Sequence, residues 1–222
     1  MTKVIFISGN KPRSGKGIVA KYLHSVTTDY GCYSEIMEFK DKLFEVTADY
    51  LGISVEEFLE HYDVRSSELT YSEQLSHGNS NHHFKDYEWV KDYPMYGAYS
   101  SYFSKRQALI HVSEDVYKPA YGKDYFGSAL AERIEHQDFV FISDSGFVEE
   151  AIPVIEKVGV ENCLVVQLIR DDASDVKDSR KMLTPEDFTD NMRPSFRRVY
   201  NNGTIEELEE SLEKVVLTWC EK

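Results

Sequence analysis

Apolar and polar residues follow each other along this chain in two patterns, one typical of strands and the other of helices. Short runs rich in β-branched and aromatic residues predict strands. They cover residues 3–8, 33–39, 138–147 and 162–170. The first run, KVIFIS, is a continuous apolar stretch that ends at a glycine, which is typical of a strand buried on both faces of a parallel sheet.

Apolar residues at helical spacing follow the first strand: Ile18, Val19, Tyr22, Leu23 and Val26. Segments of this kind predict six helices. They cover residues 15–30, 40–53, 105–122, 124–137, 148–159 and 201–222. Glycine and proline favour helix ends, so we expect Gly52 to close the second helix, and Pro119 and Gly122 to end the third. Thr204 and Glu207 have the spacing of a capping box at the start of the last helix.

The regular succession of strands and helices predicts an α/β fold, a doubly wound parallel sheet flanked by helices, within one domain over residues 1–222. Residues 55–104 differ from the rest because tyrosines, histidines and acids crowd there without a steady period. We interpret them as an inserted lid or acceptor-binding subdomain. Its aromatic side chains could stack on a base or form a small core of their own, and the sequence favours neither.

The amino-acid composition limits the classes of protein to which this chain could belong. Hydrophobic residues make up 41% of the chain and charged residues 29%, which is typical of a globular protein. No apolar run approaches the roughly 20 residues that cross a bilayer, and no signal peptide is evident, so we expect a cytoplasmic protein without a membrane partner. The net charge of −14 argues against a general nucleic-acid binder, although a local group of amides and cations could still hold a small anion.

The most informative motif is GNKPRSGKG, residues 9–17, between the first strand and the first helix. A standard phosphate-binding loop reads G-x-x-x-x-G-K-[ST]. Here five residues separate Gly9 from Gly15, and Gly17 stands where a hydroxyl is expected. The plain alternative is a tight turn between a strand and a helix. The strand–loop–helix context instead favours an ATP site, with backbone amides around the phosphates and Lys16 as a mobile cation.

In that interpretation, the ATP-binding residues are Arg13, Ser14, Gly15, Lys16 and Gly17. The extra residue lies before these amides, so the loop tolerates it. The missing hydroxyl at position 17 is the sharper departure, because such a hydroxyl normally binds magnesium. We therefore expect Mg²⁺ to be held without a direct ligand from the loop.

The ends of the predicted strands supply further candidates. In a parallel α/β sheet, ligands bind beyond the carboxyl ends of the strands. The loop, Phe39, Asp144 and Arg170 all fall there. We expect Asp144 to hold Mg²⁺, directly or through water. The alternative is that Asp144 caps the helix that follows it.

Five segments together resemble the bacteriophage deoxynucleoside monophosphate kinases, a branch of the P-loop small-molecule kinases. They are ISGNKPRSGKGIVAKYL, EFKDKLFEVTADYLGIS, SKRQALIHVSEDVYKPAYGKDYF, FVFISDSGFVEEAIPVIEKVG and YNNGTIEELEESLEKVV. The resemblance covers most of the chain outside residues 55–104 and 171–192. It implies transfer of the γ-phosphoryl group of ATP, with Mg²⁺, to a deoxynucleoside 5′-monophosphate, in the cytoplasm of an infected cell if the protein is phage-encoded.

The resemblance also implies roles for individual residues. Phe39, Lys40, Arg106, Lys118, Asp124 and Tyr125 would form the acceptor site. Lys16, Arg106, Asp144 and Arg170 would act in catalysis. Arg180 would reach the ATP phosphates from a basic lid that also contains Arg170, Lys177 and Lys181, although these four residues could equally form a solvated loop. A homodimer is an open alternative to a monomer.

Two departures from the family bear on function. Gly146 stands where the family has a phosphate-facing arginine, and Lys118 replaces a second arginine. Three hypotheses follow. The first is a deoxynucleoside monophosphate kinase, whose acceptor could be a 5-hydroxymethyl pyrimidine nucleotide. The second is a kinase acting on hydroxymethylated bases such as 5-hydroxymethyluracil in phage DNA, which the negative charge disfavours. The third is a nucleotide-binding protein that has lost catalysis.

Overall fold

A computed structural model describes residues 1–59, 105–171 and 181–220. The chain divides into two compact units: residues 1–41 together with 123–222, and residues 42–122. The expected insertion at 55–104 falls in the second unit. Only its first five residues are described, so its role as a lid or acceptor domain stays a prediction.

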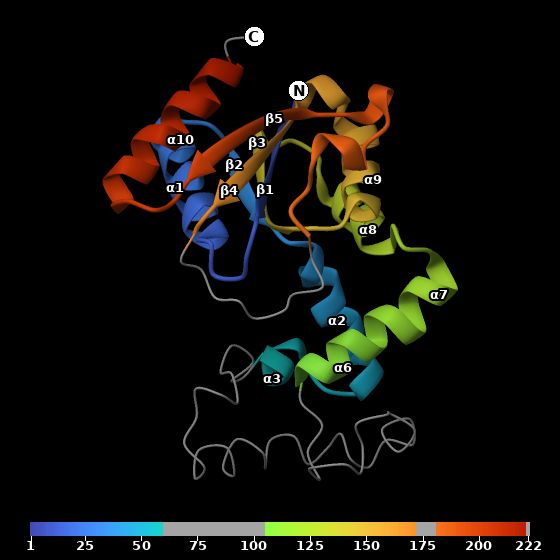
Figure 1. The fold of residues 1–222 in the computed structure, drawn as a ribbon. Helices are drawn as coiled ribbons and strands as arrows, with labels where there is room; N and C mark the ends of the chain where they lie inside the picture. The colour runs from blue at the N-terminus through green and yellow to red at the C-terminus, as the bar shows by residue number, and fades with distance from the viewer. Residues whose placement is uncertain (60–104, 172–180, 221–222) are drawn as a thin grey trace, which may run out of the picture. The chain divides into compact units, whose positions relative to one another are not determined.

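The first unit is built on a sheet of five parallel strands (Figure 1). The strands are β1 (Lys3–Gly9), β2 (Ser34–Met37), β3 (Phe139–Ser145), β4 (Cys163–Ile169) and β5 (Ser195–Tyr200). Their order across the sheet is β2-β3-β1-β4-β5. The predicted α/β fold with a parallel sheet is confirmed.

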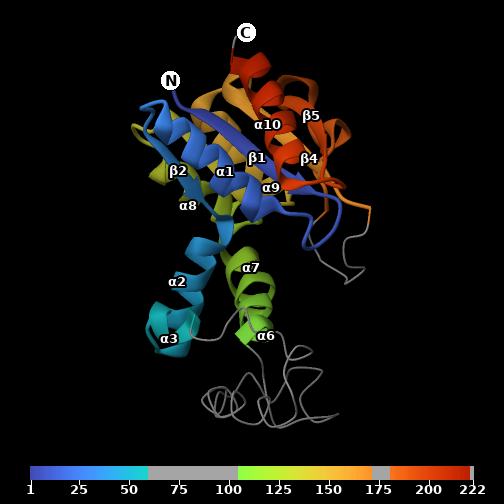
Figure 2. The ribbon, with the colours of Figure 1, turned by 90° about the vertical axis from the view of Figure 1, so that its left-hand side faces the viewer.

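Helices flank the sheet on both faces, with α1 and α10 on one and α8 and α9 on the other (Figures 1 and 2). Their bounds are α1 Lys16–Asp29, α8 Tyr125–Arg133, α9 Val148–Val158 and α10 Ile205–Cys220. Short 3₁₀ turns cover Val160–Asn162 (η4), Pro185–Asp187 (η5) and Asp190–Met192 (η6). The capping box before α10 is confirmed, because Thr204 and Glu207 each accept the backbone N–H of the other.

Burial of β1 on both faces explains its continuous apolar sequence. Residues Val4 to Ile7 are fully buried. Ile5 and Ile7 belong to the core cluster that α1 and α10 cover, together with Leu23, Leu212 and Trp219. The intervening side chains point to the opposite face, since successive residues of a strand alternate. β1 is therefore held rigidly at the centre of the sheet, directly before the Gly9–Gly17 loop.

The described part of the second unit, residues 42–59 and 105–122, is helical. Its elements are α2 (Phe39–Leu51, which starts in the first unit), α3 (Val55–Leu59), α6 (Lys105–His111), the π-helical segment η3 (Val112–Tyr117) and α7 (Lys118–Tyr121). Its apolar core contains Phe44, Leu51, Phe58 and Leu109. Lys105 Nζ donates to the Glu57 carbonyl at 3.0 Å and joins α6 to α3. The prediction that α2 ends before Gly52 is confirmed.

One helix end differs from the prediction. Pro119 does not end the helix over residues 105–122, because it lies in the first turn of α7 after the π-helical segment. A proline costs least in the first turn of a helix, where its missing N–H would have no partner. Gly122 does end the helical segment, as expected.

β5 was not predicted from the sequence. It reads SFRRVY, and its edge position leaves most of its side chains at least partly exposed, so it lacks the apolar run of the central strands β1, β3 and β4. In the part of the chain that the structure describes, no helix has both the length and the apolar character that crossing a membrane requires.

Candidate functional site

Functional candidates meet at one edge of the sheet because all five strands run in the same direction. The carboxyl ends of β1, β2, β3 and β4 deliver the Gly9–Gly17 loop, Phe39, Asp144 and Arg170 to this edge. The prediction that these residues share an edge is confirmed. In open α/β sheets this is where ligands bind.

The Gly9–Gly17 loop has an unusual backbone conformation, which its sequence predicts only in part. Arg13 and Gly15 both have left-handed φ angles, 61° and 100°. Arg13 is the only non-glycine residue with a positive φ among the described residues. α1 begins immediately afterwards at Lys16, so the first amides of a 14-residue helix open into this loop. Such amides have no acceptor inside the helix, and with the helix dipole they favour an anion.

Two polar side chains converge over Gly9. A methyl group added to Gly9 would lie 2.1 Å from Ser14 Oγ and 3.4 Å from Lys16 Nζ. Ser14 is completely buried, and its hydroxyl has no hydrogen-bond partner among the described residues. A buried hydroxyl without a partner is costly, so it commonly marks a place where a ligand or water binds. The loop thus encloses a hydroxyl donor, and an ammonium group lies against it.

Asn10 shows how the loop accommodates its extra residue. Its N–H donates to the Leu168 carbonyl at 3.2 Å. Its side chain pairs with the backbone of Arg170, through Asn10 Nδ2 to the Arg170 carbonyl at 3.2 Å and the Arg170 N–H to Asn10 Oδ1 at 3.1 Å. Hydrogen bonds therefore hold the first half of the loop at the end of β4, away from the residues at which α1 begins.

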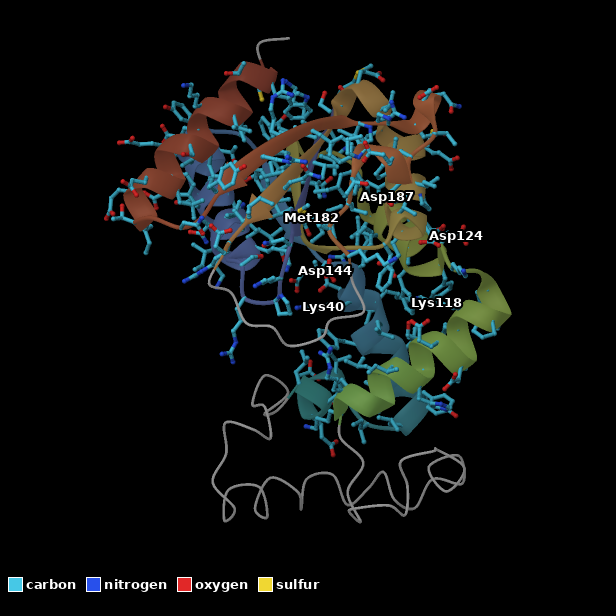
Figure 3. All side chains as sticks on the ribbon, viewed as in Figure 1. Lys40, Lys118, Asp124, Asp144, Met182 and Asp187 are labelled. Carbon is cyan, nitrogen blue, oxygen red and sulfur yellow. The ribbon has the colours of Figure 1, made fainter. Side chains whose placement is uncertain are left out.

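Asp144 is almost fully buried, with 6% of its surface exposed, and it holds the start of α2. Its Oδ1 accepts the Phe39 N–H at 3.0 Å and its Oδ2 accepts the Lys40 N–H at 3.1 Å. Asp144 and Lys40 lie beside each other in Figure 3. The carboxylate thus binds the first amides of α2, whereas the alternative drawn from the sequence had it capping the helix that follows β3.

The pKa of Asp144 is raised from 3.8 to about 6, chiefly by burial and next by the charge of Glu38. The two amide donors and the Lys40 ammonium act in the opposite direction and limit the rise. Asp144 is therefore mostly ionised at neutral pH and titrates within the range in which enzymes work. Buried groups with such shifts are frequent at functional sites.

Glu38 is a site residue that the sequence analysis missed. It follows β2 directly, accepts a hydrogen bond from Ser143 Oγ and pairs with Lys40 Nζ at 3.0 Å. Its side chain stays 27% exposed. The signal that could have found it is its position, since it lies between a strand end and Phe39, which was itself a candidate.

The chain returns to this edge after residues 172–180. The Lys181 N–H donates to the Gly146 carbonyl at 3.2 Å, and the Leu183 N–H donates to Ser8 Oγ at 2.8 Å. Gln167 Nε2 then donates to the Leu183 carbonyl at 2.8 Å. A lysine is therefore held beside Gly146, the position at which the family resemblance leads one to expect an arginine.

The other predicted site residues are placed as follows. Arg106 is exposed on α6 and Lys118 pairs with Glu114 at 2.7 Å, both in the second unit. Asp124 is exposed just before α8, and Tyr125 packs edge-on against Phe126. Arg180 and Lys177 lie outside the described residues. The roles predicted for these six side chains stay predictions.

The expected magnesium ion can be tested against the donors at this edge. Mg²⁺ favours oxygen ligands, and it is commonly bound by one or two carboxylates with phosphate oxygens and water. Each carboxylate oxygen of Asp144 accepts one amide hydrogen and has a second lone pair, and Glu38 adds another carboxylate beside it. These residues fit Mg²⁺ that is shared with a phosphate ligand. Among the described residues, no group of three or more His, Cys, Asp or Glu side chains forms a self-sufficient metal site.

Comparison with known proteins gives no family for this chain: no protein-family model matches it, and neither does any curated protein.

Proposed function

We propose that this protein transfers the γ-phosphoryl group of ATP to a deoxynucleoside 5′-monophosphate. The observation that carries the proposal is the convergence of the Ser14 hydroxyl and the Lys16 ammonium over Gly9, at the N-terminus of α1. A site lined by helix amides, a hydroxyl and a lysine is suited to the phosphate oxygens of a nucleotide.

Each residue would have a defined task in this reaction. The amides of residues 13–17 would hold the β- and γ-phosphates, and Lys16 would stabilise the charge that develops on the transferred group. Asp144 and Glu38 would hold Mg²⁺, which neutralises phosphate charge during the transfer. Lys181, held beside Gly146, would supply a cation at the position of the missing arginine.

The nature of the acceptor rests on the resemblance to deoxynucleoside monophosphate kinases, which this edge of the sheet supports through Phe39 and Lys40. The backbone of both residues is fixed by Asp144. A monophosphate acceptor needs no general base, because its phosphate oxygen is already anionic. Positioning and cations are then the main requirements of catalysis.

The test is a coupled assay for ADP release with ATP, Mg²⁺ and a panel of deoxynucleoside monophosphates that includes 5-hydroxymethyl pyrimidine nucleotides. The proposal predicts turnover with at least one member of the panel. ATP binding without turnover of any acceptor would instead favour a nucleotide-binding protein that has lost catalysis.

Glu38 favours a second candidate, in which the acceptor is a hydroxyl group such as that of a 5-hydroxymethyl pyrimidine base, free or in DNA. A hydroxyl must lose its proton as the new O–P bond forms and the bond to the leaving ADP oxygen breaks. A partly exposed carboxylate beside Asp144 could accept that proton. Measured at saturating Mg²⁺, Glu38→Gln should then reduce transfer to a hydroxyl acceptor far more than transfer to a monophosphate, which loses only the contribution of Glu38 to Mg²⁺ binding. Equal rates of the wild type and the Glu38→Gln variant on the hydroxyl acceptor would exclude this candidate.

A further inference from the structure

Asn201, the first residue after β5, lies against the Gly9–Gly17 loop although it is distant in sequence. Its side-chain Nδ2 donates to the Ser14 carbonyl at 2.9 Å, across 187 residues of chain. Its backbone N–H donates to the Ile169 carbonyl at 2.8 Å, which continues the pairing of β4 with β5. The position of the carboxamide is therefore set by the sheet itself.

The contact with the loop is close. A methyl group added to Gly15 would lie 2.6 Å from Asn201 Nδ2, so the carboxamide occupies the space that a side chain at position 15 would need. Gly15 also has a left-handed φ of 100°, which side chains rarely adopt. Both features limit position 15 to glycine.

The hydrogen bond determines where an amide points. A trans peptide unit is planar, so the carbonyl of Ser14 and the N–H of Gly15 point in opposite directions. When Asn201 holds the Ser14 carbonyl on its own side of the loop, the Gly15 N–H is turned the other way, away from Asn201. Without this bond the peptide could rotate and present a carbonyl oxygen, which would repel an anion.

We propose that Asn201 is a positioning residue that fixes the Ser14–Gly15 peptide in the orientation that binds phosphate. The inference rests on the proposed nucleotide site, since it assigns Asn201 to the ATP phosphates and not to the acceptor. Asn201 acts through the loop and does not itself touch the ligand.

Asn202 offers a matched control. It is the neighbouring residue of the same type and it also makes side-chain hydrogen bonds, but to Asp171, at 2.7 Å and 3.0 Å. Asn201→Asp keeps the shape of the side chain and replaces its N–H donor by an oxygen that repels the Ser14 carbonyl. Asn202→Asp makes the same chemical change one residue away.

The first experiment needs no ligand. Hydrogen exchange of the Val19 amide, which donates to the Gly15 carbonyl at 3.0 Å, should become at least about tenfold faster in Asn201→Asp than in the wild type, since release of the Ser14–Gly15 peptide loosens this first bond of α1. Exchange in Asn202→Asp should stay within about twofold of the wild type. Equal exchange in the two variants would overturn the inference, whatever the protein binds.

The second experiment measures binding of inorganic tripolyphosphate and of ATP by calorimetry, together with steady-state kinetics. Asn201→Asp should lose about tenfold in affinity for both probes and raise KM for ATP, with KM for the acceptor unchanged. If Asn201→Asp binds tripolyphosphate and ATP as tightly as Asn202→Asp does, the inference is overturned. If the wild type binds neither probe, the proposed function fails, and the exchange measurement still decides whether Asn201 holds the loop.

Discussion

Asp144 and Phe39 are joined by a hydrogen bond of 3.0 Å between residues 105 positions apart in the chain, one at the end of β3 and the other at the start of α2. The second carboxylate oxygen holds the amide of Lys40 in the same way. A buried acid thus fixes the backbone at the edge where the candidate site lies. Its two roles, structural acceptor and proposed magnesium ligand, can be separated by experiment.

The pH dependence of the reaction should show the titration of Asp144. Its pKa of about 6 means that the ligand form is lost as the pH falls through 6. We expect kcat/KM for ATP, measured at low magnesium concentration, to fall about tenfold for each pH unit well below about 6. High magnesium concentration should move this limb to lower pH, because the cation favours the carboxylate. An activity that is flat between pH 5 and 7 would contradict the assignment.

The titration of Asp144 should also make the free energy of unfolding depend on pH. Because the pKa of Asp144 is raised on folding from 3.8 to about 6, the folded protein binds the proton more tightly, and the stability from this group is lost as the pH rises from about 4 to about 6. Asp144→Asn cannot titrate. The free energy of unfolding of the variant minus that of the wild type should therefore increase by roughly 2 kcal/mol between pH 4 and pH 7. Denaturant unfolding at several pH values measures this difference, and a constant value would contradict the raised pKa.

Removal of the Ser14 hydroxyl should affect binding but not folding. The hydroxyl is buried without a partner, so Ser14→Ala should leave the unfolding temperature unchanged or higher, while ATP affinity falls by roughly tenfold. Thr47 carries the other buried, unpartnered hydroxyl of the described residues and provides the control. Thr47→Val should stabilise the protein similarly and leave ATP affinity unchanged. Unaltered ATP affinity in Ser14→Ala would show that the hydroxyl does not face the ligand.

Gly9 should not tolerate a side chain. An alanine Cβ there would lie 2.1 Å from Ser14 Oγ and 3.2 Å from Ser14 Cβ, so Gly9→Ala should cost roughly 1–3 kcal/mol of unfolding free energy as the loop is displaced. Gly17→Ala is the matched control, since no atom lies within 4 Å of its added Cβ and alanine favours the helix. Chemical denaturation of both variants makes the comparison. A Gly9→Ala variant as stable as Gly17→Ala would show that the loop is not closed over Gly9.

The fold could be predicted from the sequence wherever the residues of one segment alone form a pattern typical of a strand or a helix. β2, at one edge of the sheet, mixes polar and apolar residues. β1, β3 and β4 show continuous apolar runs, because these central parallel strands are buried on both faces. β5 does not, since Arg197 and Arg198 lie on an exposed edge strand. The sequence predicts a helix end at Pro119 because no local pattern distinguishes the π-helical segment that precedes it.

The site could be predicted only as far as strand ends and the loop motif indicate it. The order of strands and helices along the chain was enough to predict that Gly9, Phe39, Asp144 and Arg170 lie at one edge of the sheet. The hydrogen bonds of Asn201 with Ser14, and of Glu38 with Ser143, join residues more than one hundred positions apart. Such partners depend on strand order and side-chain packing, which a single sequence does not display.

The central claim is that Lys16 in the Gly9–Gly17 loop acts on the phosphates of ATP, and ADP release by Lys16→Ala tests it most directly. Lys21, exposed on α1, provides the control. With the best acceptor of the wild type, Lys16→Ala should lose about a hundredfold or more in kcat, because a cation at the transferring group is removed, while Lys21→Ala keeps the wild-type rate. Equal rates for the two variants would contradict the account.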